Sequence, residues 1–235
     1  MNDDGFDRRA FLKGAVVGGA AAVTGILSKE SEAQGAAPGT PPAAAGYAFL
    51  NPDEAAFIEA VVDHMIPADE LTPKGTDLGI NVYIDRALAG GWGKGERLYL
   101  QGPWRAGTPS QGYQLPLTPA ELYRTGIVAA NAACAKAHGK PFEKLAAAQR
   151  EAFLLDWRAG KVEFEQGPPA RVFFNQLYAN VMEGMFADPI HGGNRNKAAW
   201  RMIGFPGAIA LNYQNVEKFR GRKFPNDPVG IQDMS

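Results

Sequence analysis

Apolar residues recur at three- and four-residue spacing along this chain, between residues that typically start and end helices. Asn51 is a favourable N-cap, Pro52 suits the first helical position, and Glu54 completes a capping box. The apolar face that follows consists of Phe57, Ile58, Val61, Val62 and Met65. No segment shows the two-residue alternation of a half-buried strand. The sequence therefore predicts an all-α fold, a single irregular helical domain with long ordered loops.

Other segments carry similar helix signals. Thr118, Pro119 and Glu121 form a second capping box, which predicts a helix from 119 to about 138 that ends before Gly139. We expect a short helix after Asp77, one that ends near Trp157, and a long one that starts at residues 168–169. One stripe of the 119–138 helix should allow close packing against another helix, because it carries Gly126, Ala130, Cys134 and His138.

The N-terminal residues indicate export. Arg8 and Arg9 precede Phe11 and Leu12, and a mildly apolar run of 14 residues follows from position 14 to 27. This run is shorter than the roughly 20 residues that a membrane-spanning helix needs. We expect residues 1–33 to be a twin-arginine signal peptide, cleaved after Ala33 or retained, and read by the twin-arginine translocase. A membrane anchor and a disordered tail are the alternatives.

A Pro- and Ala-rich linker is expected over residues 34–48, and the helical domain with an extended C-terminal tail over 49–235. Without residues 1–33 the chain carries 20 basic and 20 acidic residues. A net charge near zero argues against nucleic acid as a partner.

Residues 89–117 form an unusually long connection rich in Gly, Pro and aromatic residues. Trp92, Trp104 and Arg105 give it the composition of an interaction surface, and we consider them candidates for partner binding. The alternative is an irregular loop that folds onto its own domain.

The sequence offers little catalytic or metal-binding chemistry. The three histidines, His64, His138 and His191, lack the spacing of metal ligands, and no nucleophile elbow or Walker loop is present. Cys134 is the only cysteine, so the chain cannot supply a covalent haem attachment motif. We expect no metal site, and FAD or haem c would have to lie on other chains. Cys134 is either a buried apolar residue or a candidate for an inter-subunit disulfide.

The segment from Asp188 to Gly207 is punctuated by Gly and Pro. Gly192 and Gly193 allow a close backbone approach, and Asn194 can bridge backbone groups. Arg195 can pair with a carboxylate such as Asp188 or Asp69, or hold an anion. The segment is therefore a buried turn, a loop docked on a partner near its cofactor, or an independent ligand site.

Several blocks of the chain resemble the gluconate 2-dehydrogenase subunit 3 family over roughly residues 49–207. These blocks are residues 66–69 with 73–76, 122–126, 186–195, and Trp200 with 204–207. His191, Thr76 and Ala199 depart from the usual Tyr, Ala and Gly. The resemblance implies a periplasmic complex that is membrane-associated through its other subunits. In it a large glucose-methanol-choline-type subunit carries FAD and oxidises the substrate, and a multihaem cytochrome c subunit passes electrons to quinone.

Together these features lead us to expect a non-catalytic small subunit that supports folding, stability and co-export of the FAD-bearing subunit. The substrate would then be chosen by another chain. The partner-binding candidates are Trp92, Trp104, Arg105, His191, Asn194, Arg195 and Trp200. Two alternatives remain open at this point. The chain itself catalyses a hydrolytic or redox step with His191 and Arg195 or Asp188, or the 188–195 loop binds a sugar acid.

Overall fold

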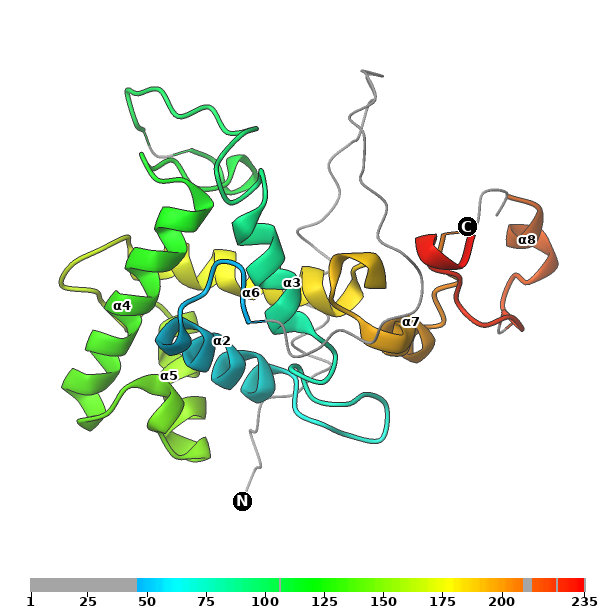
Figure 1. The fold of residues 1–235 in the computed structure, drawn as a ribbon, viewed down its shortest axis with the longest axis horizontal. Coiled ribbons are helices and arrows are strands. Elements are labelled where there is room, and N and C mark those ends of the chain that lie inside the picture. The colour runs from blue at the N-terminus through cyan, green and yellow to red at the C-terminus, as the bar shows by residue number, and fades with distance from the viewer. Residues whose placement is uncertain (1–45, 106, 209–212, 223, 235) are drawn as a thin grey trace. The chain divides into compact units, whose positions relative to one another are not determined.

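The computed structural model describes residues 46–234, apart from 106, 209–212 and 223. The proposed signal residues Arg8, Arg9, Phe11 and Leu12 and the cleavage residue Ala33 lie outside the described residues. Residues 47–235 form one compact unit. Its described part contains seven α-helices and no β-strand, and Gly207 and Val229 form an isolated parallel bridge. The all-α prediction is confirmed (Figure 1).

Helix α2 (Pro52–Met65) begins where its capping box predicts. The Asn51 Oδ1 accepts a hydrogen bond from the Glu54 N–H at 3.0 Å, and the Glu54 Oε2 accepts one from the Asn51 N–H at 3.0 Å. All five residues of the predicted apolar face are at most 1 % exposed. Local capping and apolar spacing therefore suffice to define this helix.

Helix α3 (Ile80–Ala89) starts after Gly79, two residues later than Asp77. Its buried face includes two polar residues, Asn81 and Asp85. The Asp85 carboxylate accepts three backbone N–H groups, at 2.8 Å from Ala48 and at 2.9 Å from Phe49 and Leu50. This ties the segment that precedes α2 onto α3. Ala48, which we expected in the linker, therefore belongs to the packed unit.

Helices α4 (Pro119–His138) and α6 (Ala170–Phe186) approach each other closely. The cause is Gly126, where an added Cβ would lie 2.5 Å from the ring of Phe173. Ala130 and Cys134, on the same stripe of α4, are fully buried. The small-residue stripe predicted from the sequence therefore does bring two helices together, and Gly139, with φ of +70°, ends α4 as expected.

Trp157 of helix α5 (Ala147–Arg158) lies at the centre of an aromatic core. Its Nε1 donates a hydrogen bond to the Ala170 carbonyl at 2.8 Å, which satisfies the one polar atom of the side chain. Four aromatic rings lie within 5.7 Å of the Trp157 ring, those of Phe153, Phe164, Phe173 and Phe174. This cluster joins α5 to the first half of α6.

The remaining elements are short. The 3₁₀ turns are η1 (Pro109–Gln111), η2 (Phe142–Lys144), η3 (Pro189–His191), η4 (Arg195–Lys197) and η5 (Ile231–Met234). Helices α7 (Ala198–Ile203) and α8 (Tyr213–Lys218) complete the described chain. Across the described residues, no helix combines the length and apolar character required to span a bilayer.

Substitution of Asp85 tests how the N-terminal segment is anchored. We expect Asp85→Ala to lower the free energy of unfolding by about 3 kcal/mol, because three N–H groups lose a charged acceptor. Urea denaturation measures the change. Asp156→Ala, which removes an exposed ion pair with Lys161, should change it by less than about 0.5 kcal/mol. Equal effects of the two substitutions would contradict this anchoring role.

Candidate functional site

The segment from Asp188 to Trp200, called here the 188–200 loop, packs unusually tightly against the end of α6. Gly192 has a φ of +99°, in the region that favours glycine. At Gly193 an added Cβ would lie only 2.1 Å from the carbonyl oxygen of Gly184. The loop can therefore approach α6 only through a residue without a side chain, as the pair of glycines predicts.

Asn194 holds this approach in place from inside the protein. Its side-chain Nδ2 donates to the Ala187 carbonyl at 3.0 Å, and its Oδ1 accepts from the Ala199 N–H at 3.0 Å. The predicted bridging of backbone groups is confirmed. However, Asn194 is 0 % exposed, so the expectation that it contacts a partner is not met.

The Trp200 side chain also points into the protein interior. It is 4 % exposed, its Nε1 donates to the Phe186 carbonyl at 2.7 Å, and its ring packs edge-on against Phe205 at 5.2 Å. Its proposed place on a partner surface is likewise not met. Asn194 and Trp200 instead fasten the start of α7 to the end of α6.

Arg195 and His191 remain on the surface of the loop. The Arg195 backbone N–H donates to the Leu78 carbonyl at 3.0 Å, but its guanidinium forms no ion pair with Asp188. The Asp188 carboxylate is occupied by the N–H groups of Ile190, at 3.0 Å, and Ile231, at 2.8 Å. The suggested Arg195–Asp188 pair is therefore wrong, and the Asp188 carboxylate instead joins two backbone segments.

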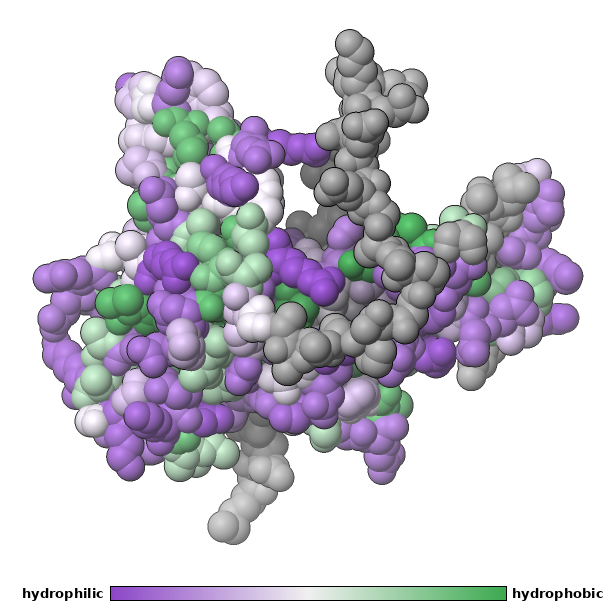
Figure 2. All heavy atoms as spheres, viewed as in Figure 1, coloured by the Kyte–Doolittle hydropathy of each residue, from purple (hydrophilic) through white to green (hydrophobic). Residues whose placement is uncertain are grey.

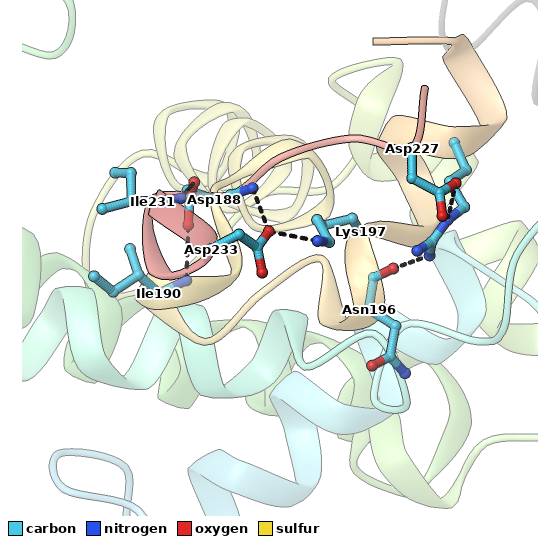
Figure 3. A network of polar contacts seen from close by, with 9 residues as sticks. Asp188, Ile190, Asn196, Lys197, Asp227, Ile231 and Asp233 are labelled. Atoms are coloured by element: carbon cyan, nitrogen blue, oxygen red, sulfur yellow. Dashed lines mark hydrogen bonds and ion pairs between the residues drawn. The ribbon is translucent and has the colours of Figure 1, made fainter. Parts of the chain in front are cut away.

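A second connection to the C-terminal tail was missed by sequence reasoning. Asp233 accepts hydrogen bonds from the Lys197 Nζ at 2.5 Å and from the Gly230 N–H at 2.7 Å (Figure 3). The Lys197 hydrogen bond lowers the pKa of Asp233 below its usual value. With Asp188 bonded to Ile231, these contacts fasten η5 to the 188–200 loop. The bonded residues are 36 or more positions apart in the sequence, and sequence spacing does not predict pairs at such a separation.

The 89–117 loop carries the other candidate residues. Trp92 is 37 % exposed, Trp104 is half-buried and Arg105 is exposed. Three more apolar residues of the loop are exposed, Leu98, Tyr99 and Leu100. Figure 2 shows apolar residues within this loop, at the top left of the view, surrounded by hydrophilic ones. The loop therefore presents apolar surface of the kind found at protein interfaces.

Two of the exposed candidates, Arg195 and Trp92, lie at opposite ends of α3. Arg195 bonds to Leu78 and lies beside Gly79, just before α3, whereas Trp92 follows its last residue, Ala89. His191 lies between these positions, because it lines the same hollow as Arg86 and Ala87. Ten helical residues span about 15 Å along the axis. A partner that contacts both Arg195 and Trp92 would therefore have to extend along the length of α3.

The remaining ionisable residues that the structure describes do not converge on a common site. His64 Nε2 lies 2.7 Å from Glu151, and His138 is half-buried at the end of α4. In the described part of the chain no group of His, Cys, Asp and Glu residues is placed to hold a metal ion. Cys134 is 0 % exposed, and burial raises the pKa of its thiol to about 12. This corresponds to the buried alternative rather than to a thiol that can reach another chain.

Comparison with known proteins gives one result. The family model described as gluconate 2-dehydrogenase subunit 3 matches residues 52–207, about two thirds of the sequence. The chain belongs to the gluconate 2-dehydrogenase subunit 3 family. We found no match among curated proteins and none among solved structures. Membership of the gluconate 2-dehydrogenase subunit 3 family indicates an accessory subunit of a multisubunit dehydrogenase complex.

The match places the 188–200 loop within the subunit 3 domain and the C-terminal tail outside it. The matched region starts at the first residue of α2 and ends at Gly207, the residue that pairs with Val229 of the tail. The contacts of Asp188 and Lys197 therefore join the family domain to a segment that the family model does not include.

Removal of the Asn194 side chain tests its role in the loop. We expect Asn194→Ala to lower the free energy of unfolding by roughly 3 kcal/mol, because a buried N–H and a carbonyl lose their partners. The φ of residue 194 is +45°, which strains an alanine more than a glycine. Asn194→Gly therefore removes the same hydrogen bonds without this backbone strain. Urea denaturation measures both variants. A loss below about 0.5 kcal/mol in both would refute the role, and exposed Asn226→Ala serves as the control.

The burial of Cys134 leads to a separate expectation. The native protein should not react with Ellman's reagent at neutral pH, and should react fully once denatured in guanidinium, because both access and the thiolate form are suppressed. Absorbance of the released thiolate follows the reaction. A complex that shows a dithiothreitol-sensitive band at summed mass in non-reducing electrophoresis would instead demonstrate an inter-subunit disulfide.

Proposed function

We propose that this chain is the non-catalytic small subunit of a periplasmic flavoprotein dehydrogenase–cytochrome c complex. It supports the folding and stability of a glucose-methanol-choline-type subunit that carries FAD, and the two chains leave the cytoplasm together through the twin-arginine translocase. A multihaem cytochrome c subunit completes the complex and associates it with the membrane. Membership of the subunit 3 family is the observation that carries this proposal.

The exposed apolar residues of the 89–117 loop support a role in assembly. Leu98, Tyr99 and Leu100 are 38–79 % exposed, and Trp92 of the same loop is 37 % exposed. Leaving such a group in water is unfavourable, and covering it with a partner would contribute roughly 25 cal/mol per Å² of buried apolar area. Residues 34–235 carry equal numbers of basic and acidic residues, so net charge on this chain adds little electrostatic repulsion against a partner.

The geometry of the 188–200 loop favours this role over independent catalysis. A general base has to face the substrate, whereas the Asp188 carboxylate faces the backbone N–H groups of Ile190 and Ile231. Asn194 is enclosed, and Arg195 and His191 are on the outer surface. The loop is therefore better suited to shape a surface than to move a proton.

The FAD and haem c of the proposed complex belong to the other subunits. In this proposal the contribution of the present chain is to keep the flavoprotein folded with its FAD until the translocase accepts it. Because the twin-arginine pathway carries folded proteins, one signal on the small subunit would serve both chains. We also expect the gene for the flavoprotein to lie next to that of this chain.

Deletion of the small subunit tests co-export directly. When the neighbouring flavoprotein is expressed without this chain, we expect its FAD-dependent activity to disappear from the periplasmic fraction. Arg8→Lys combined with Arg9→Lys should retain both proteins in the cytoplasm, because the translocase no longer reads the signal. Activity and immunoblots of the two fractions provide the measurement. Undiminished export in both cases would contradict the proposal.

The alternative is that the chain itself catalyses a reaction, and an activity assay of the purified small subunit tests it. Purified small subunit should show no turnover of alcohols or sugar acids with an artificial electron acceptor. Turnover that is lost in His191→Ala would support catalysis by this chain instead.

A further inference from the structure

A hollow of about 620 Å³ lies between α3 and the end of α6, beside the 188–200 loop. We propose that this hollow and the surface beside it at Arg195 receive an acidic segment of the partner dehydrogenase subunit, with Arg86 in the hollow and Arg195 next to it holding the segment. The lining of the hollow includes Tyr83, Arg86, Glu183, Phe186, Ile190 and His191. The inference rests on the proposed function and goes beyond it, because it assigns a contact surface and the chemistry of the segment that fits it.

Two arginines pack against the same turn of the loop. An added Cβ at Gly192 would lie 3.2 Å from a terminal nitrogen of Arg86. An added Cβ at Gly79 would lie 2.8 Å from the Arg195 Nε and 2.2 Å from the Gly192 carbonyl oxygen. Both side chains are exposed. The turn at Gly192 therefore positions two guanidinium groups on one stretch of surface.

These two guanidinium groups lack acidic partners within the described part of the chain. Neither Arg86 nor Arg195 forms an ion pair there. Glu183, the acid that lines the hollow, already accepts a hydrogen bond from Asn180 at 2.7 Å and a long one from Tyr83 at 3.4 Å. As far as the described residues go, the donors of both arginines therefore face no acid and can bind a group from outside.

Carboxylates match these donors best. The planar guanidinium fork forms two parallel hydrogen bonds with one carboxylate, which a neutral group cannot reproduce. Arg195 also lies beside Gly79, the residue that precedes α3, so the helix itself does not offset its positive charge. An incoming acidic side chain would provide the missing opposite charge.

The apolar residues around the arginines indicate a polypeptide rather than a free sugar acid. Ile190 is 38 % exposed and lies next to Ile231 of the tail, which is 48 % exposed, since both donate to the Asp188 carboxylate (Figure 3). Met234 at the end of η5 is 56 % exposed. A segment with acidic and apolar side chains uses both parts of this surface, whereas a polyhydroxylated acid gains little from the apolar part.

Charge reversal tests the surface. The full-length chain is expressed with the neighbouring flavoprotein, and the dissociation constant of the complex is measured at low and high salt. We expect Arg86→Glu with Arg195→Glu to weaken binding at least about tenfold and to flatten the salt dependence. Arg171→Glu is the matched control, because Arg171 is exposed in the first turn of α6, where an acid is tolerated.

The outcomes separate this inference from the proposed function. If the unmodified chain binds the flavoprotein and the double reversal binds equally well, the surface is wrong and the accessory role stands. If the unmodified chain does not bind, both are overturned. Arg86→Gln with Arg195→Gln repeats the test without added negative charge, should the reversed variant fail to fold by circular dichroism. Calorimetric binding of gluconate to the isolated chain, abolished by the Gln pair, would overturn the assignment to a polypeptide.

Discussion

The close backbone approach of Gly193 to Gly184 determines how the 188–200 loop lies against the end of α6. An added Cβ at Gly193 would lie 2.1 Å from the Gly184 carbonyl oxygen, so no other residue fits without displacing the loop. The buried Asn194 amide then bonds to Ala187 and Ala199, on either side of the loop. His191 and Arg195 remain exposed on the outer side of the loop, whereas Asp188 and Lys197 bind the C-terminal tail.

This division between interior and surface explains why the 188–200 loop resembles a docking surface more than an active site. The Asp188 carboxylate accepts backbone N–H groups from Ile190 in the loop and from Ile231 in the C-terminal tail, and it therefore joins these two segments. Arg86 and Arg195 form no ion pair with other described residues, and the neighbouring isoleucines are partly exposed. A subunit whose task is to cover another protein needs fixed surface shape, which buried hydrogen bonds supply.

Much of the fold could be predicted from local sequence, because helix caps and apolar spacing act over only a few residues. The capping boxes at Asn51 and Thr118 and the terminating Gly139 appear where expected. The candidate site was predicted less well. Asn194 and Trp200 were assigned to a partner surface, whereas both are buried. A Gly-rich loop indicates close packing, but it does not indicate which side chains face inward.

The sequence by itself determined the helical class, the starts of the capped helices α2 and α4, and the buried apolar face of α2. Only the tertiary structure decided that Asp85 would bind the segment before α2, and that Asp233 would bind Lys197 across 36 positions. Periodicity reports which face of a helix is apolar. Pairing between distant polar groups depends on how the helices pack, and packing is a property of the whole chain.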